Sequence, residues 1–388
     1  MTDPVFAERL KALDIETSFE ILARASALEA KGHEIIHLEI GEPDFETPVN
    51  VRKAAVKAIE DGYTHYGPSA GLAEARSAIA EFVARDRGVP VTPDQVVITP
   101  GGKSIIFFSM LALVEPGDEV IYPNPGFPNY QATINFCGGV PVPMPLREKD
   151  GFSVDLDHFE SLVTTKTKLC VINSPQNPTG GTFPKDVLEG IASIASRNGF
   201  YVLSDEIYSR IIYDRPHESY YSIPGAADHT ILLDGHSKTY AMTGWRLGYG
   251  VMPKELAVKV ARIAGNSSSC TCSFTQIAGI EALRGPQDAV IRMVDEFRAR
   301  RDLIVDGVND LAGFRCHKPA GAFYVFPNIT GTGKTSKELA TLLMEKAGVA
   351  VIAGTSFGTG GEGFIRMSYA ASREKLYRAL EKIGDALR

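Results

Sequence analysis

From about residue 90 onward, short apolar runs typical of buried strands alternate with helical segments in this chain of 388 residues. Such alternation favours an α/β fold built on a parallel sheet. Four of the runs are closely followed by Gly101, Asn177, Asp205 and Lys238. In an open α/β sheet the carboxyl ends of the strands share one edge, where ligands bind. The pattern therefore predicts that a glycine turn, an amide, a carboxylate and an amine meet at that edge.

Composition narrows the class of protein. The net charge of −7 argues against a nucleic-acid partner, for which a basic stripe is expected. No apolar run is long enough to cross a bilayer, and the polar N-terminus is unlike a signal peptide. The 5 cysteines are scattered, without zinc-ligand spacing, which indicates reduced thiols in a cytoplasmic protein with no metal site.

Several polar residues have both a structural and a chemical interpretation. Lys238 can be an ordinary solvated loop lysine, but a desolvated lysine changes its pKa readily and suits Schiff-base chemistry. Asp205 can be a helix N-cap. The Gly101-Gly102-Lys103 turn before a helix can bind an anion at the positive helix end, or exist for backbone reasons alone. An arginine that alternates into an apolar strand, as Arg366 does, costs free energy unless an anion pairs with it.

The stretch HSKTYAMTGWRLGYG, residues 236–250, resembles the cofactor-lysine segment of fold-type I aminotransferases of class I/II, which use pyridoxal 5'-phosphate (PLP). The family pattern is Ser-Lys, a linker of small residues, and then Gly-x-Arg-x-Gly. The resemblance implies that Lys238 holds PLP covalently and that Arg246 binds its phosphate. Many members carry a phosphate-binding serine where this chain has Gly235, so Ser237 and backbone amides must bind more of the phosphate.

Further segments resemble the family's cofactor site. The asparagine of Asn-Pro-Thr-Gly, Asn177, is implied to donate to the 3'-oxygen of PLP, and so is Tyr208. Asp205 is implied to hold the proton on the pyridine nitrogen, without which PLP is a poor electron sink. Phe127 stands where the family stacks an aromatic ring on the pyridine. The cofactor-binding set expected from the resemblance is Tyr66, Gly101, Gly102, Lys103, Phe127, Asn177, Asp205, Tyr208, Ser237, Lys238 and Arg246.

The resemblance also implies substrate contacts and a partner subunit. Gly41, in Gly-Glu-Pro-Asp-Phe, and Asn177 are expected to contact the substrate carboxylate, and Arg366 is expected to grip it with two parallel hydrogen bonds. Tyr66 matches the tyrosine that reaches the PLP phosphate of the other subunit. The implied assembly is therefore a homodimer with shared active sites.

The implied fold has a large domain with a mainly parallel seven-stranded sheet flanked by helices, and a smaller α+β domain formed by the N-terminal arm and the C-terminal part. We expect an N-terminal arm over residues 1–45, the PLP-binding domain over 46–285 and the C-terminal domain over 286–388. Residues 33–40, 314–316, 322–326, 349–352 and 363–368 have strand character. Residues 265–274, rich in small polar side chains, are expected to form a loop.

The predicted function is an aminotransferase that moves the amino group of an L-amino acid to a 2-oxo acid such as 2-oxoglutarate or pyruvate. The alternatives are a C–S β-lyase or an aminocyclopropane-carboxylate-synthase-like enzyme on the same fold, and more remotely a PLP-sensing regulator. Aspartate, aromatic, alanine and broad specificity all fit the sequence. A second cation for an acidic side chain has His33, Lys103 and residues of the partner subunit as candidates.

Overall fold

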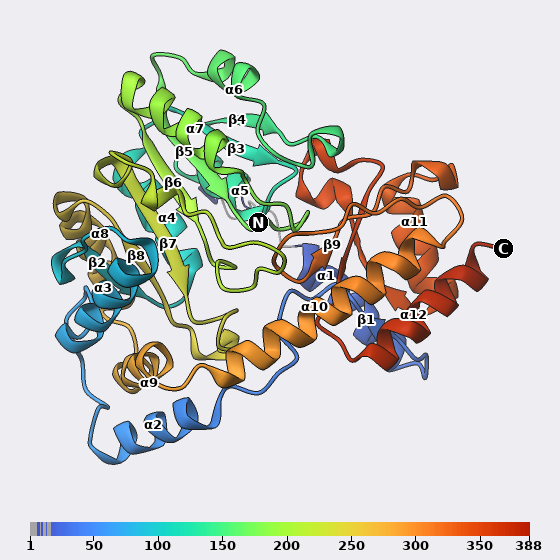
Figure 1. Ribbon diagram of the computed structural model, residues 1–388, viewed down its shortest axis with the longest axis horizontal. Coiled ribbons are helices and arrows are strands. Elements are labelled where there is room, and N and C mark those ends of the chain that lie inside the picture. The colour runs from blue at the N-terminus through green and yellow to red at the C-terminus, as the bar shows by residue number, and fades with distance from the viewer. Residues whose placement is uncertain (1–5, 8, 11–12, 14–16) are drawn as a thin grey trace, which may run out of the picture.

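A seven-stranded sheet runs through the larger part of the computed structural model (Figure 1). The structure describes residues 6–7, 9–10, 13 and 17–388, so residues 1–5, 8, 11–12 and 14–16 of the predicted N-terminal arm lie outside the described residues. The strand order is β2-β8-β7-β6-β5-β3-β4. Only β8 runs antiparallel to its neighbours, β2 and β7. The predicted mainly parallel sheet is confirmed.

The strands of this sheet are β2 (Val96–Thr99), β3 (Glu119–Asn124), β4 (Val140–Pro145), β5 (Thr167–Asn173), β6 (Tyr201–Asp205), β7 (Thr230–Gly235) and β8 (Gly248–Val251). The helices that accompany them are α2 (Val49–Glu60), α3 (Ala73–Arg87), α4 (Gly102–Leu113), α5 (Asn129–Phe136), α6 (Leu156–Leu162), α7 (Lys185–Asn198), α8 (Lys254–Ser268) and α9 (Ser273–Arg284).

Both faces of the sheet are covered by helices, because its strands bury alternate residues on opposite sides. In β5, for example, Leu169 and Val171 pack in the cluster with α4, α5 and α8. Cys170 and Ile172 belong to the cluster on the other face, which includes α6 and α7. A third cluster joins α2, α3 and α9 to β2 and β8. Helices on both faces leave the carboxyl ends of the strands as the accessible edge of the sheet.

The C-terminal region is smaller and mixes short strands with helices (Figure 1). Its strands are β9 (Tyr324–Val325), β10 (Val349–Ala350), β11 (Ile352–Ala353) and β12 (Ile365–Ser368), and its helices are α10 (Asp288–Asn309), α11 (Ser336–Leu342), extended by a π-helical turn over Leu343–Ala347, and α12 (Arg373–Ala386). The N-terminal elements α1 (Thr17–Glu29) and β1 (Ile36–His37) lie beside it, since β1 pairs in parallel with β10. The domain division at residues 45/46 and 285/286 stays a prediction.

Three expectations about local structure need correction. The strand expected over 349–352 is two strands in different sheets, β10 beside β1 and β11 beside β12. The segment 33–40 contributes only the two residues of β1, and 314–316 forms only an isolated bridge between Arg315 and Asn328. Short segments of this kind satisfy their backbone groups partly in turns, so their apolar pattern overstates the length of the strand.

The predicted loop over 265–274 is wrong at both ends, because α8 continues to Ser268 and α9 begins at Ser273. Asn266 donates to the carbonyl of Arg262 at 2.8 Å, and the Ser268 hydroxyl donates to the carbonyl of Ala264 at 3.4 Å. Small polar residues that bond backward in this way fit within a helix. The connecting segment is therefore only residues 269–272.

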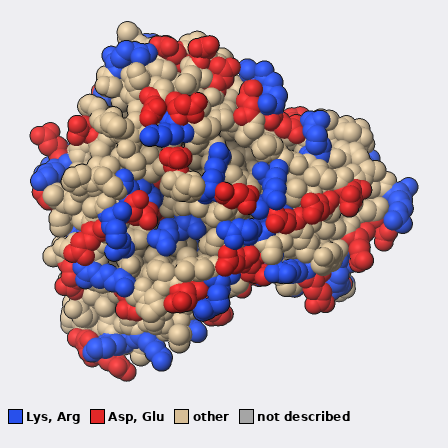
Figure 2. Space-filling view, viewed as in Figure 1, with Lys and Arg blue, Asp and Glu red and all other residues tan. Residues whose placement is uncertain are grey.

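None of the described helices is long and apolar enough to cross a membrane. Figure 2 shows acidic and basic side chains interspersed over the face that it displays.

Candidate active site

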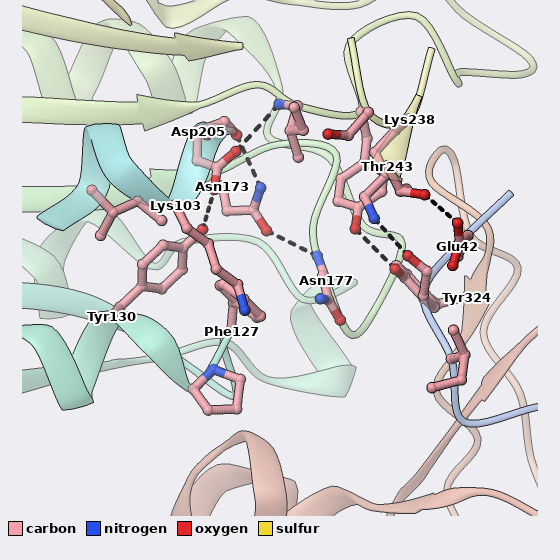
Figure 3. A pocket seen from close by; sticks show the side chains of 18 of the residues that line it. Glu42, Lys103, Phe127, Tyr130, Asn173, Asn177, Asp205, Lys238, Thr243 and Tyr324 are labelled. Atoms are coloured by element: carbon pink, nitrogen blue, oxygen red, sulfur yellow. Dashed lines mark hydrogen bonds between the residues drawn. The ribbon is translucent and has the colours of Figure 1, made fainter. Parts of the chain in front are cut away.

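A pocket of about 550 Å³ lies at the carboxyl edge of the large sheet and is closed on its other side by residues from the C-terminal region. Cavities of this size accommodate small ligands. Eleven of the predicted site residues line it, and they come from segments far apart in the chain: Gly41, Gly102, Lys103, Phe127, Asn177, Asp205, Tyr208, Ser237, Lys238, Arg246 and Arg366. Figure 3 shows Lys103, Phe127, Asn177, Asp205 and Lys238 around this pocket.

Lys238 follows the end of β7 and points into the pocket toward the N-terminal segment. Its Nζ donates to the carbonyl of Gly41 at 2.5 Å, and the ring centre of Phe323 lies 5.9 Å away. The side chain is partly buried, and Ser237 beside it is buried. The lysine therefore lies within the pocket, so the interpretation as an ordinary solvated loop lysine is wrong.

Asp205 ends β6, and its carboxyl group is buried. Burial raises the pKa of Asp205 to about 6, while hydrogen bonds from Tyr130 and the Ile207 amide act in the opposite direction. The Tyr130 hydroxyl donates to Oδ2 at 2.6 Å, and the Ile207 amide donates to Oδ1 at 3.2 Å. The second bond has the character of a local cap, yet the residue also lines the pocket. A carboxylate in this position can stabilise a protonated nitrogen of a bound ring.

Asn173, the last residue of β5, connects the ends of two strands. Its amide nitrogen donates to the backbone carbonyl of Asp205 at 2.9 Å, and its amide oxygen accepts from the backbone N–H of Asn177 at 2.9 Å (Figure 3). The side chain of Asn177 in turn accepts a hydrogen bond from Arg366, with 3.0 Å between Oδ1 and Nη1. One chain of hydrogen bonds thus runs from the end of β6 to β12.

Arg366 is buried, and its guanidinium contacts two aromatic rings. Its Cζ is 4.5 Å from the ring centre of Tyr324 and 5.0 Å from that of Phe357. Nη2 donates to the backbone carbonyl of Glu39. Rings on a guanidinium favour the cation and restrict the orientation of its plane. The arginine is therefore fixed in a position that suits a two-point contact with a carboxylate.

Tyr208 lies next to this arrangement. Its hydroxyl is 2.8 Å from the hydroxyl of Tyr324 (distance between the two oxygens), and burial raises the pKa of Tyr208 well above its ordinary value. The phenol is therefore neutral at physiological pH and can donate a hydrogen bond toward the pocket.

The start of α4 and the side chain of Arg246 approach each other closely. Gly101 precedes the helix with φ of +83°, and a side chain there would collide with the guanidinium of Arg246. Arg246 donates to the carbonyl of Thr243 at 2.8 Å, and that interaction holds it at the pocket. A helix N-terminus, a cation and the hydroxyl of Ser237 are the donors that a phosphate group requires.

Two predicted residues stand apart. Gly101 is not among the described residues that line the pocket, although it allows Arg246 to approach. Tyr66 is 90% exposed and is also not in the lining of its own chain's pocket. His33, a candidate for the second cation, is exposed and is likewise not part of that lining.

Sequence reasoning missed four residues that organise the site: Tyr130, Asn173, Tyr324 and Phe357. Asn173 could have been found, because it ends an apolar strand just as Asp205 does. Tyr130 follows the proline-rich turn after β3. Its contact with Asp205 depends on the tertiary structure, so no local sequence pattern indicates it. Tyr324 and Phe357 resemble ordinary core aromatics in the sequence, and only packing brings them to Arg366.

Comparisons with known proteins agree with this geometry. The family described as aminotransferase class I and II matches residues 33–383. An aspartate aminotransferase of Pyrococcus horikoshii is 42% identical over 98% of this chain and 97% of its own length. An aspartate/prephenate aminotransferase of Thermus thermophilus is 39% identical over 98% of both chains. The solved structure of aspartate aminotransferase from Thermus thermophilus with maleate superposes with a TM-score of 0.95 at 37% identity, covering 99% of this chain and 100% of that one.

The fold and the pocket define an α/β enzyme of the PLP fold type I. The chain belongs to the class I and II aminotransferases, a family of PLP-dependent transaminases, and it is an amino-acid aminotransferase. The relatives' names indicate amino-group transfer rather than the lyase, synthase or regulator alternatives.

The buried carboxyl group of Asp205 gives a prediction about cofactor-free protein. Its pKa is raised from an ordinary 3.8 to about 6, so the folded state binds this proton more tightly than the unfolded state. The contribution of Asp205 to stability therefore falls as pH rises from about 4 to 6, by on the order of 3 kcal/mol. Asp205→Asn, which cannot ionise, should lack this loss.

The measurement is the free energy of unfolding of both cofactor-free proteins between pH 4 and pH 8. The difference between the two curves isolates Asp205, because the neighbouring Asp234, whose pKa burial raises to about 7, titrates in both. Parallel curves would contradict the assignment of a raised pKa to Asp205.

Proposed function

We propose that the pocket binds PLP, that the residues present fit this group, and that the predicted residues have their predicted roles, except that Lys103 is assigned to the substrate side chain below. The fit rests on three kinds of group at one edge of the sheet: the amine of Lys238, the buried carboxyl group of Asp205, and the phosphate-binding groups at the start of α4 and on Arg246. When bound, PLP supplies an electron sink for the carbanion formed at the substrate α-carbon. Lys238 would attach the cofactor, Asp205 would hold the proton on its ring nitrogen, and Arg246, Ser237 and the start of α4 would bind its phosphate.

The protein's own groups then carry out the proton movements. The amine of Lys238 would be the base that takes the proton from the substrate α-carbon. Tyr208 and Asn177 would hold the 3'-oxygen by donated hydrogen bonds, and Phe127 would cover the ring. Arg366 binds the substrate α-carboxylate, which orients the bond to be broken.

The preferred substrates, in our proposal, are dicarboxylic: aspartate as donor and a 2-oxo acid such as 2-oxoglutarate as acceptor. The observation that carries this is Lys103, in the first turn of α4, which lines the same pocket as Arg366 from the opposite part of the fold. Its Nζ lies 5.3 Å from the ring centre of Phe127 (Figure 3). A second cation beside the cofactor ring suits a side-chain carboxylate. The aspartate aminotransferases among the relatives support the same choice.

A homodimer is part of the proposal. Tyr66 lies on an exposed loop, with 90% of its surface accessible. A second copy of the chain that covers this loop would bring Tyr66 to the partner's phosphate site.

Lys238→Ala tests the proposed attachment of the cofactor. Turnover should fall to nearly nothing, because both the covalent attachment and the proton-transfer base are lost. Borohydride reduction followed by peptide mass spectrometry should label Lys238 in the parent protein and leave the variant unlabelled. Lys103→Ala is the matched control and should keep the label on Lys238. Substantial turnover in Lys238→Ala would refute the proposed mechanism.

Arg366→Lys tests substrate binding apart from cofactor binding. Lysine keeps the charge but cannot form two parallel hydrogen bonds to a carboxylate. We expect an unchanged PLP absorbance spectrum. The value of kcat/KM should fall by an amount that corresponds to a loss of roughly 2–5 kcal/mol in transition-state binding. The loss should be similar for aspartate and phenylalanine, since both carry the α-carboxylate. A loss confined to aspartate would show that Arg366 contacts the side chain instead.

Lys103→Met tests whether Lys103 binds the side-chain carboxylate of the substrate. The substitution keeps most of the length and removes the charge, so kcat/KM for aspartate should fall by roughly 10- to 100-fold, the worth of one charged hydrogen bond. The value for phenylalanine should change little. Steady-state kinetics with both donors gives the ratio, and an equal fall for both would assign Lys103 to the cofactor phosphate.

A further inference from the structure

The segment that connects β11 to β12, residues 354–364, carries Phe357 to Arg366. Its first part, residues 355–360, is tied to the last residue of β3 and the turn after it by three hydrogen bonds. The Gly126 amide donates to the carbonyl of Phe357 at 2.8 Å. The side chain of Asn124 donates to the Thr359 hydroxyl at 2.9 Å and accepts from the Gly360 amide at 2.9 Å. We call these contacts the Asn124 clamp.

The clamp is tight. Gly358 has φ of +111°, a conformation that favours glycine, and a side chain there would collide with Oδ1 of Asn124. Asn124 itself is buried, whereas Thr359 is exposed. The connection thus joins the end of a central strand to a segment more than 230 residues later in the chain.

The clamp determines where the Phe357 ring lies. That ring is buried, and its centre is 5.0 Å from Cζ of Arg366, which also lies 4.5 Å from the ring centre of Tyr324. Without the clamp, one of the two rings that restrict the guanidinium could move, and the plane of the guanidinium would be less well defined. Two parallel hydrogen bonds to a carboxylate require a defined plane.

We propose that Asn124 and Phe357 are positioning residues for the substrate carboxylate: Asn124 fixes the segment 355–360, this segment fixes Phe357, and Phe357 orients Arg366. The inference rests on the proposed function, since it takes Arg366 to bind the α-carboxylate. The same turn after β3 carries Phe127 into the pocket, so the end of β3 contacts both the proposed cofactor site and, through the clamp, the substrate site.

The test uses the PLP-loaded protein and two substitutions, Asn124→Ala and Thr359→Val. KM for aspartate and for phenylalanine should rise by the same factor, about tenfold for Asn124→Ala and less for Thr359→Val, which removes one hydrogen bond. The PLP absorbance spectrum should stay unchanged, and kcat should fall by a smaller factor than KM rises, because the substitutions act mainly on substrate binding. Thr355→Val, an exposed threonine of the same segment outside the clamp, is the matched control and should behave like the parent.

A double-mutant cycle with Arg366→Lys separates the inference from a general structural role. If Asn124 acts through Arg366, Asn124→Ala should raise KM much less in the Arg366→Lys background than in the parent. Fully additive effects, or an unchanged KM in both Asn124→Ala and Thr359→Val, would overturn the inference. The exposed Thr359→Val decides the matter should Asn124→Ala fold poorly. An Arg366→Lys variant with the parent's KM would instead refute the proposed function.

Discussion

The parallel register of β5 and β6 is the constraint on which the site depends. It places Asn173 opposite Asp205, and the Asn173 side chain closes the gap with hydrogen bonds to the Asp205 carbonyl and the Asn177 amide, both of 2.9 Å. A slip of one residue would turn every strand-end side chain to the other face of the sheet. The buried apolar faces on both sides prevent such a slip, so the hydrophobic pattern of the strands fixes the positions of the polar groups at their ends.

Burial of charge around the pocket is compensated by specific partners. Glu206, next to Asp205 in the chain, pairs with Arg87 at 3.0 Å, and the Arg87 guanidinium also lies 3.4 Å from Asp234 in β7. Burial raises the pKa of Asp234 to about 7, whereas the Arg87 guanidinium and His217 outweigh burial and lower the pKa of Glu206 to about 2. One buried arginine, Arg87, therefore pairs with carboxylates at the ends of both β6 and β7. These ion pairs hold the segments that carry Asp205 and Lys238 in a fixed position relative to each other.

The sheet and most of the site could be predicted because they depend on local pattern. Apolar runs followed at once by Gly101, Asn177, Asp205 and Lys238 show both the strands and the edge where their ends meet. The contacts of Tyr324 and Phe357 with Arg366 could not be predicted, since they depend on how two distant segments pack. The strand β4 was missed because Pro141, Pro143 and Pro145 argue against a central strand, and only its place at the sheet edge allows them.

The edge strand β4 also affects whether two molecules can associate by pairing their strands. The amides of Val140 and Leu146, at either end of β4, donate inward to the carbonyls of Asp118 and Asn124 at 2.8 and 2.9 Å. The three prolines occupy the alternate positions, whose nitrogens face away from β3 and carry no hydrogen. The outer side of β4 thus presents carbonyls without donors, and a foreign strand cannot complete a ladder on it. This edge of the sheet therefore resists intermolecular β-pairing at high protein concentration.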